Sequence, residues 1–392
     1  MKFQFFLQNY RGLRKSDFTP EGVCALVGAN GSGKSTLFAA LEFLRNLYLR
    51  PTNSAINVDG GHWGLKNLAV PVGDDVVLTL VFEQVTWIVI LRSGGAANEF
   101  LLDERLEIMS IGGPDFILGW SSLSHFQFRG ISHKRGEGSA LKLAWEMSEE
   151  TEEPELKALV QFIRSIRTYR HYALDQLREN GSRVDADLSL SRRGENLFAI
   201  LRNWRDKRDL RASYDFVIEG LRAAFPDFFD DIEFYGDSQT IRAKVYLQGV
   251  PEPMPLTFVP DGLLVAMLHL AAVAGSPGPS FVAIDDFENF LHPFALRSLV
   301  ESIRNWSDHR DLCVVLATHS PVVLDQFRAD PTHVFVMEVD QKEKPIRLDD
   351  LRDPEWLSHF SLGDLYSQLE FGARLPSAET KSASKPSRGE NQ

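Results

Sequence analysis

Cysteine is scarce in this sequence: only Cys24 and Cys313 occur among 392 residues. Two cysteines cannot build a disulfide framework, and the lack of any CxxC pair excludes the usual ligand spacing of a zinc ribbon. Both residues lie in apolar runs, VCALVG and LCVVLA. We therefore expect two buried strand cysteines in a protein of a reducing compartment.

Long hydrophobic runs and sustained heptads are also missing. The longest apolar stretch, at 262–274, is shorter than a bilayer span and contains His269. The opening segment MKFQFFLQNYRGLR alternates apolar and polar side chains, unlike a signal peptide. These absences predict a cytoplasmic protein with no membrane partner and no long coiled-coil arms.

Positive charge is in deficit, because 42 Lys and Arg stand against 54 Asp and Glu, for a net charge of −12. This balance excludes a surface that binds nucleic acid everywhere, but it leaves a local basic groove open. The segment between Arg192 and Arg211 is rich in arginine, with Arg202, Arg205 and Arg208 three apart on an expected helix. Such a pattern indicates either a solvated helix face or a phosphate-binding stripe for DNA.

Strands and helices alternate at both ends of the chain. Residues 3–27 predict two strands joined by a polar turn at 16–20. A glycine-rich loop follows, and then a helix with leucines at helical spacing. Residues 255–340 again alternate between helix and apolar strand. We therefore predict an α/β fold with one mainly parallel sheet assembled from both chain ends.

The middle of the chain has a different pattern. Short β-type runs at 76–109 predict an antiparallel lobe, and residues 153–225 are mainly helical. The predicted parts are an N-terminal lobe at 1–150, a helical insertion at 151–230, a C-terminal lobe at 231–375 and a disordered tail at 376–392.

The strongest motif is GANGSGKST at 28–36, a full match to GxxxxGK[ST] between an expected strand and helix. In such a P-loop, backbone N–H groups surround the phosphates, Lys34 reaches the β- and γ-phosphates, and the Ser35 hydroxyl binds Mg²⁺. The absence of NKxD favours ATP over GTP, and a ligand-free glycine-rich turn is the alternative reading. The residues predicted to bind nucleotide here are Gly28, Asn30, Gly31, Ser32, Gly33, Lys34, Ser35 and Thr36.

Polar residues also end two further apolar strands. After FVAI come Asp285, predicted to hold Mg²⁺, and Asp286, which with nearby Glu288 is a candidate to polarise the attacking water. The strand CVVLAT leads to His319, which we expect at the carboxyl edge of the sheet, near a γ-phosphate or the water. An acidic turn and a structural histidine are the alternatives.

Together, GANGSGKST, AIDDFENFLHP and LATHSPVVL resemble the ABC-type ATPases of the RecF/SMC class, AAA-family proteins whose compact members recur in DNA-repair and phage-defence operons. In that class two ATP molecules lie between head-to-tail protomers, and a signature loop of the partner seals each one. The matching loop here is VPDG at 259–262. The resemblance thus implies an ATP-dependent homodimer in which Asp261 and Gly262 face the partner's nucleotide.

Two positions depart from the class. Pro260 stands where the signature serine is usual, and proline offers neither a hydroxyl nor a backbone donor. Asp286 stands where a catalytic glutamate is usual and is one methylene shorter, and a displacement of ~1 Å can cost about a hundredfold in rate. The glutamine loop of the class stays unassigned between Gln84 and Gln176.

The resemblance implies an ATPase of slow turnover that regulates DNA engagement or a separate effector protein, in DNA repair or antiviral defence. A non-hydrolysing, nucleotide-gated scaffold is the first alternative. The second is the nucleotide-binding subunit of an ABC transporter, which is disfavoured because 227 residues separate Lys34 from Asp261.

Overall fold

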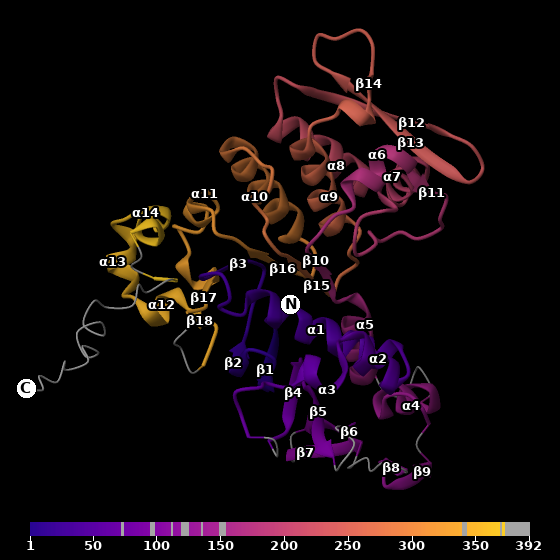
Figure 1. Cartoon of the computed structure of the whole chain (residues 1–392), viewed down its shortest axis with the longest axis vertical. Helices are drawn as coiled ribbons and strands as arrows, with labels where there is room; N and C mark the ends of the chain where they lie inside the picture. Colours follow the sequence, from indigo (N-terminus) through magenta and orange to yellow (C-terminus); the bar gives the residue numbers. More distant parts are fainter. Residues whose placement is uncertain are drawn as a thin grey trace, which may run out of the picture.

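A computed structural model of the chain describes residues 1–71, 74–94, 99–110, 113–118, 125–134, 136–148, 154–338, 343–368 and 371–372. Figure 1 shows a mainly helical lobe at the top, a lobe of antiparallel strands at the bottom and a sheet between them. A group of short helices, α11–α14, lies at the left of the sheet in the same view. The tail expected at 376–392 lies outside the described residues.

The middle sheet has six strands in the order β10-β15-β16-β3-β17-β18. Every neighbouring pair is parallel except β17 with β18. β3, from the start of the chain, lies between two strands from its end, so the predicted sheet split between the chain ends is confirmed. Its strands are β3 (Val23–Val27), β10 (Arg167–Tyr169), β15 (Ser280–Ile284), β16 (Leu312–Ala317), β17 (Val334–Val336) and β18 (Ile346–Arg347).

The lower sheet is antiparallel and has eight strands in the order β2-β1-β4-β5-β6-β7-β8-β9. It confirms the antiparallel prediction for 76–109 and adds the two N-terminal strands to it. Its strands are β1 (Phe3–Tyr10), β2 (Leu13–Phe18), β4 (Val76–Phe82), β5 (Val85–Gly94), β6 (Glu99–Ser110), β7 (Gly113–Leu118), β8 (His125–Phe128) and β9 (Ile131–Lys134).

The predicted polar turn at 16–20 is wrong, because residues 13–18 form β2. Leu13, Ser16 and Phe18 are buried while the polar residues between them are exposed, so charged side chains occupy only the open face. Phe18 then packs edge-on against Phe335, with ring centroids 5.0 Å apart. That long-range contact holds a sequence that looks like a turn in an extended strand.

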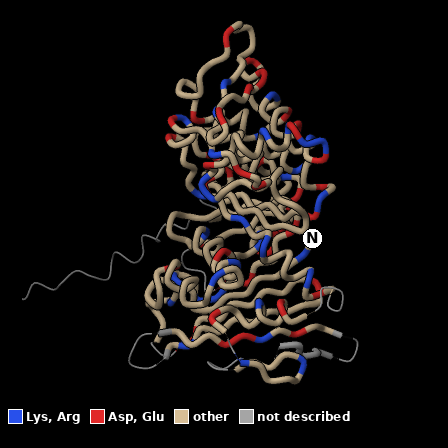
Figure 2. The backbone as a smooth tube through the Cα atoms, turned by 90° about the vertical axis from the view of Figure 1, so that its right-hand side faces the viewer, with Lys and Arg blue, Asp and Glu red and all other residues tan. Residues whose placement is uncertain are grey.

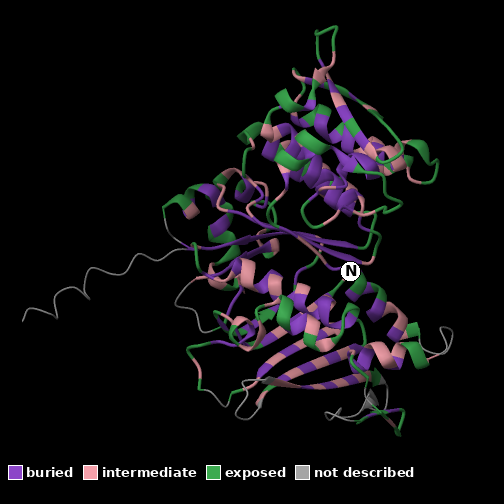
Figure 3. Cartoon of the chain, turned by 45° about the vertical axis from the view of Figure 1, so that its right-hand side comes forward, coloured by how far each residue is buried: buried purple, intermediate pink, exposed green. Residues whose placement is uncertain are grey.

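Both faces of the middle sheet are covered, as Figure 3 shows by the purple strands at the centre. Phe281 and Ala283 of β15 pack toward α1 (Lys34–Leu49) and the lower lobe. Val282 and Ile284 pack toward α9 (Asp261–Ala274) and α10 (Pro293–Ser307). A strand buried on both faces needs an uninterrupted apolar run, which explains the sequence FVAI.

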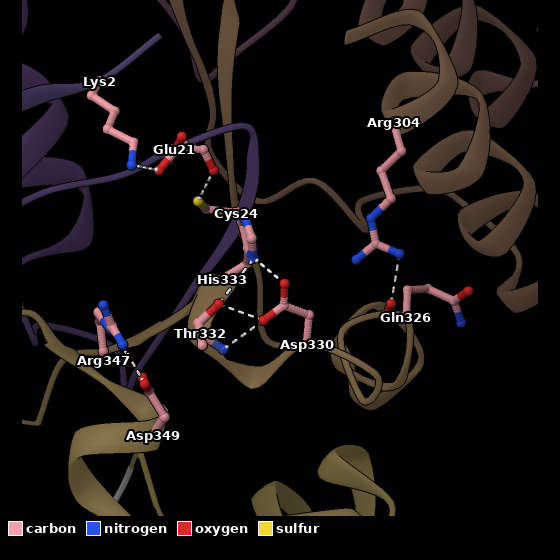
Figure 4. Close-up of polar contacts among 10 residues, drawn as sticks. All are labelled: Lys2, Glu21, Cys24, Arg304, Gln326, Asp330, Thr332, His333, Arg347 and Asp349. Carbon is pink, nitrogen blue, oxygen red and sulfur yellow. Dashed lines mark hydrogen bonds and ion pairs between the residues drawn. The ribbon is translucent and has the colours of Figure 1, made fainter. Parts of the chain in front are cut away.

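Cys24 and Cys313 are buried, unpaired residues of β3 and β16, as predicted. The Cys24 thiol donates a hydrogen bond of 3.1 Å to the carbonyl oxygen of Glu21 (Figure 4). Burial raises the pKa of the Cys24 thiol to about 12. The thiol therefore stays protonated and has little nucleophilic character.

The upper lobe carries several helices and a small sheet in which β13 pairs with β11, β12 and β14. It takes helices from the expected insertion at 151–230, but β10 within that segment belongs to the middle sheet. None of the described helices is long and apolar enough to cross a membrane.

The remaining elements are α2 (Thr52–Val58), α3 (Gly61–Leu65), α4 (Ala140–Met147), α5 (Pro154–Ser165), α6 (Leu174–Asn180), β11 (Ser182–Arg183), α7 (Leu197–Asp206), α8 (Arg211–Ala224), β12 (Phe229–Gly236), β13 (Thr240–Leu247), β14 (Met254–Pro255), η1 (Leu256–Phe258), α11 (Pro321–Asp325), η2 (Pro331–His333), α12 (Leu348–Leu351), α13 (Pro354–Ser358) and α14 (Leu362–Ser367).

Candidate nucleotide-binding site

The P-loop connects β3 to α1 and requires glycine at two positions. Gly28 and Gly33 have φ angles of 153° and 111°, a region that L side chains rarely adopt. A Cβ at Gly28 would lie 2.1 Å from the Met337 carbonyl oxygen, and one at Gly33 2.6 Å from a Leu13 methyl. The loop is therefore packed tightly against Met337, the residue after β17, and against Leu13 of β2, with its open side toward a cavity.

That cavity has a volume of about 740 Å³ and is lined by the P-loop together with Asp285, Asp286 and His319. The sequence predictions are thus brought together at one site, although 285 residues separate Lys34 from His319. The Ser32 hydroxyl beside it is buried and has no hydrogen-bond partner. An unsatisfied donor in a glycine-rich loop at a helix N-terminus fits a phosphate ligand.

Lys34 is held inside the site. Its Nζ donates to the carbonyl oxygens of Gly28 and Ala29, at 2.6 and 3.4 Å, and lies 3.0 Å from His319 Nε2. Burial lowers the pKa of Lys34, against the opposing charges of Asp285 and Asp286. All three ammonium hydrogens thus have acceptors within the protein, and a phosphate would have to replace at least one of them.

Asp285 is buried at the end of β15 and accepts a hydrogen bond of 2.5 Å from Ser35 Oγ. Arg170 Nε lies 3.5 Å from the same carboxylate oxygen. Burial raises the pKa of Asp285, while the Ser35 hydrogen bond and Arg170 oppose that rise. No group of three or more His, Cys, Asp or Glu side chains able to hold a metal occurs among the described residues. A magnesium ion here would need phosphate and water oxygens beside Ser35 and Asp285.

Asp286 and Glu288 have different surroundings. Both Glu288 oxygens are occupied, by Thr318 Oγ1 at 2.7 Å and the His319 backbone N–H at 2.8 Å. The Asp286 carboxylate makes no hydrogen bond or ion pair with any other described residue and faces the P-loop cavity. Asp286 has a φ of 54°, which turns the chain sharply at this point. Of the two predicted water-polarising groups, Asp286 is the available one.

His319 follows β16 and connects the P-loop to the C-terminal helices. Its Nδ1 lies 3.1 Å from the Tyr366 hydroxyl of α14. Because an ammonium only donates, Nε2 must accept from Lys34, which places the ring proton on Nδ1. Burial and the charge of Lys34 lower the pKa of His319. The ring is therefore neutral and oriented from both sides.

Asp261 and Gly262 lie at the N-terminus of α9 and do not line the P-loop cavity. The Asp261 carboxylate pairs with Arg178 of α6, whose guanidinium also donates to the Val259 carbonyl oxygen at 2.9 Å. A Cβ at Gly262 would lie 2.6 Å from the Phe290 carbonyl oxygen, so glycine permits a close contact there. This helix end therefore lies outside the P-loop cavity, but Asp261 lines a neighbouring pocket of about 300 Å³ together with Asp285 and Asp286.

Sequence reasoning missed three residues of the site. Arg170 follows β10, the strand beside β15, and lies against Asp285. Tyr366 bonds His319, and the Gly372 carbonyl oxygen accepts a 2.8 Å hydrogen bond from the Ala29 backbone N–H of the P-loop. Nothing in the sequence near Tyr366 or Gly372 resembles a motif, whereas Arg170 could have been suspected as the polar end of a strand.

Neither glutamine considered for the glutamine loop lines the P-loop cavity. Gln84 lies in the turn between β4 and β5, where its carbonyl oxygen accepts from the Met109 backbone N–H. Gln176 lies on α6. The polar side chain beside Asp285 at the end of the neighbouring strand is Arg170.

The expected arginine stripe does not form on one helix. α7 ends at Asp206, so Arg208 lies in the turn before α8. Arg205 pairs with Asp206 at 2.9 Å, and its guanidinium lies 5.1 Å from the Phe234 ring centroid. Figure 2 shows acidic and basic positions interspersed over the upper lobe. These contacts match the solvated-face reading of the segment.

Comparison with known proteins gives a family and a set of similar folds. A family model described as "AAA domain, putative AbiEii toxin, Type IV TA system" matches residues 23–99 and 173–325. No curated protein matches the sequence.

The solved structures similar to this chain include SMC head domains. The SMC head bound to the C-winged helix domain of ScpA is 12% identical, with a TM-score of 0.47, over 89% of this chain and 99% of that one. The SMC head domain from Thermotoga maritima is 14% identical, with a TM-score of 0.42, over 86% and 94% of the two chains. The Pyrococcus furiosus head with an extended coiled coil, bound to the C-terminal domain of ScpA, is 10% identical, with a TM-score of 0.41, over 82% and 90%.

Proposed function

We propose that this chain, which belongs to the AAA-domain family described as putative AbiEii toxins of type IV toxin–antitoxin systems, is an ATPase that binds ATP and Mg²⁺. In this proposal it hydrolyses ATP slowly and dimerises head to tail on ATP. The model of that family matches more than half of the chain. The AAA-family membership expected from the motifs and the α/β P-loop fold are confirmed.

The contacts of Lys34 carry the proposal best. A buried ammonium that touches two P-loop carbonyls and His319 belongs to a cavity built for anionic groups. Lys34, Ser32 and the backbone of the loop would hold the phosphates, and Ser35 with Asp285 would hold Mg²⁺. Bound there, Mg²⁺ would neutralise charge on the phosphate oxygens.

Asp286 is the proposed group for polarising the attacking water, because its carboxylate faces the cavity and has no hydrogen-bond or ion-pair partner among the described residues. Glu288 is proposed as a positioning residue, since it fixes the Thr318 hydroxyl and the His319 backbone. The shorter side chain of aspartate would place the carboxylate farther from the water than a glutamate would. We therefore expect slow turnover.

Dimerisation is proposed from the surface around the start of α9. Phe258 and Phe290 flank this helix end and are 72% and 65% exposed. Large exposed aromatic side chains beside a free helix N-terminus favour a protein partner that covers them. A second copy would bring its own P-loop phosphates to Asp261 and Gly262, which lie outside this chain's P-loop cavity.

The test compares wild type with Lys34→Ala and Asp286→Asn. We expect Lys34→Ala to weaken ATP binding by about a hundredfold and to remove ATP-dependent dimers, because a charge-assisted contact is lost. Asp286→Asn should keep binding and dimers but release phosphate at a rate near zero. Equilibrium binding of a fluorescent ATP analogue, light scattering and phosphate release are the readouts.

A non-hydrolysing scaffold is the second candidate, favoured by Pro260, which removes a donor at the signature-like loop, and by the short Asp286 side chain. ATP-induced dimers without phosphate release from wild type would establish the scaffold and refute the ATPase. ATP-independent oligomers would refute both.

In the cell, we propose that the ATP-driven dimer acts in the cytoplasm as a switch for DNA engagement or for a separate effector protein, in DNA repair or antiviral defence. The contacts of Arg205 and Arg211 with Asp206 and Asp215 disfavour the α7 region as a DNA surface. Co-purification of the tagged chain with its partners, with and without the Lys34→Ala change, tests whether a partner depends on ATP.

A further inference from the structure

A second pocket, of about 380 Å³, adjoins the P-loop cavity and shares Glu42, Asn46 and Arg192 with it. Both cavities follow one face of α1, because positions 35, 39, 42 and 46 line them at helical spacing, and Arg50 directly follows the end of this helix. At 1.5 Å per residue, Arg50 is about 22 Å along the helix from Ser35. The second pocket therefore extends well beyond the phosphate-binding end of the P-loop cavity.

Positive charge is concentrated in this pocket. The charged residues that line it are Arg45, Arg50, Arg167, Arg192, Glu42 and Asp187. Glu42 is already used, since one of its oxygens lies 3.0 Å from Arg192 and accepts a 2.9 Å hydrogen bond from Thr168. No ion pair joins Arg45, Arg50 or Arg167 to a carboxylate in the part of the chain that the structure describes. Three arginines of the pocket thus have no ion-pair partner among the described residues, although the net charge of the chain is −12.

Backbone carbonyls, rather than carboxylates, hold two of these guanidinium groups. Arg45 Nε donates to the Arg164 carbonyl oxygen at 3.5 Å, and Arg167 Nη1 donates to the same oxygen at 2.5 Å. Burial and the neighbouring charge of Arg167 lower the pKa of Arg45 to about 10. Like charges gathered in a concave, partly buried place cost free energy unless an anion offsets them.

The side chains that line the pocket suit the phosphate groups of a ligand rather than a nucleotide base. The only aromatic side chain that lines the pocket among the described residues is Tyr169, which is 2% exposed and whose hydroxyl bonds the Leu190 carbonyl oxygen. No ring is therefore available for a base to stack on. Guanidinium groups match phosphate oxygens in shape and charge.

We propose that this arginine pocket, formed by Arg45, Arg50, Arg167 and Arg192, binds a phosphate-bearing anion through its phosphoryl oxygens, separately from the nucleotide on the P-loop. The source of the phosphoryl groups is either a free polyphosphate or the backbone of a nucleic-acid strand. Because Arg192 and Glu42 line both cavities, an anion in the arginine pocket adjoins the nucleotide site directly.

The test uses the full chain with Lys34→Ala, so that the P-loop contributes little to phosphate binding. Sodium tripolyphosphate is titrated by calorimetry into this parent and into the parent with Arg45→Gln, Arg167→Gln or Arg50→Gln added. We expect the parent to bind and each added change to weaken binding about tenfold. Arg50 is exposed, so its replacement should not disturb folding.

The matched control is Arg202→Gln with Arg208→Gln, two arginines of the upper lobe outside the arginine pocket. This variant should bind tripolyphosphate as the parent does. The proposal is overturned if the Lys34→Ala parent does not bind, or if the pocket and control variants bind alike. A failed proposal here leaves ATP binding by wild type untouched, so the two results are separable.

A second arm identifies the source of the phosphate. A fluorescent single-stranded oligonucleotide of about 20 nucleotides is titrated at several salt concentrations against the same variants. If the oligonucleotide binds and the arginine changes lower its salt dependence, the strand backbone is the source. If only tripolyphosphate binds, the source is a free polyphosphate. The proposal would be contradicted if the oligonucleotide bound the arginine-pocket variants as tightly as the parent but did not bind the control variant.

Discussion

The P-loop edge of the sheet and the N-terminus of α9 are both helix ends with polar side chains, but they are completed differently. At the P-loop, Lys34 and Ser35 bond His319 and Asp285, which follow the ends of β16 and β15, around one cavity. At the start of α9, the ion pair that the described residues form is Arg178 with Asp261, and the exposed side chains of Phe258 and Phe290 flank the helix end. The first is a site built within the chain, while the second is the surface at which we propose that a second copy binds.

His269 joins these two regions. It lies on α9, is buried, and stacks on Phe287 with ring centroids 4.8 Å apart. Its Nε2–H donates to the Phe287 carbonyl oxygen at 3.1 Å, and the Tyr172 hydroxyl lies 3.1 Å from Nδ1. Phe287 directly follows Asp286, so a movement of α9 would shift the backbone next to the carboxylate that we propose polarises the water.

The largest effect is expected when Asp286 and Glu288, the two carboxylates considered for the attacking water, are replaced one at a time. Asp286→Asn should lower phosphate release by about a hundredfold or more, because a general base contributes that much. Glu288→Gln should cost only about tenfold, since its amide oxygen still accepts one of the two hydrogen bonds. Single-turnover kinetics with ATP measures both, with ATP affinity as the control. A larger loss in Glu288→Gln would reverse the two roles.

The next test concerns His269, which links α9 to Phe287. Burial lowers the pKa of His269 to about 4. Between that value and about 6.5 the unfolded chain binds a proton that the folded chain does not. Titration of His269 therefore costs no stability above about pH 6.5. As the pH falls toward 4 it lowers the free energy of unfolding, by about 2 kcal/mol at pH 5.

Urea unfolding at pH 7.5 and pH 5 checks this prediction. His269→Gln is the matched variant, because glutamine keeps a donor for Phe287 and an acceptor for Tyr172 without titrating. Its loss of stability between the two pH values should be smaller than that of wild type. Equal losses would show that other groups carry the acid sensitivity.

A weaker effect is expected at the α9 end. Arg178→Ala frees Asp261 beside the surface proposed to meet a second copy, and should weaken ATP-dependent dimers by about tenfold. ATP affinity of the monomer should not change, because neither residue lines the P-loop cavity. Sedimentation velocity with and without ATP gives the dimer constant. If monomer affinity fell as well, the two regions would not be independent.

The smallest predicted effect belongs to Tyr366. Tyr366→Phe removes the acceptor for His319 Nδ1 and should slow turnover by only a few-fold. Because that acceptor favours the protonated ring most, its loss should lower the pKa of His319 and move the acid limb of the rate profile to lower pH. A rate loss without such a shift would indicate a purely structural role for Tyr366.

The local parts of the site were predictable from sequence, and the distant ones were not. An apolar strand, GANGSGKST and a helix follow one another directly, so the P-loop needed no tertiary information. Asp285 and His319 could be placed because parallel strands end at one edge. Arg170, Tyr366 and Gly372 reach the site only through chain folding. The expected arginine stripe does not form because α7 ends at Asp206, before Arg208. The polar sequence around this point does not indicate where the helix ends.

The hydrogen bond from the Ala29 N–H to Gly372 has a consequence for the order of events during synthesis. The ribosome makes the P-loop first and the residues that close over it, His319, Tyr366 and Gly372, near the end of the described chain. At about 5–20 residues per second, roughly 20–70 s pass between the two. A nascent chain therefore spends that time with an exposed glycine-rich loop, and its nucleotide cavity takes its final shape only when these last partners have emerged.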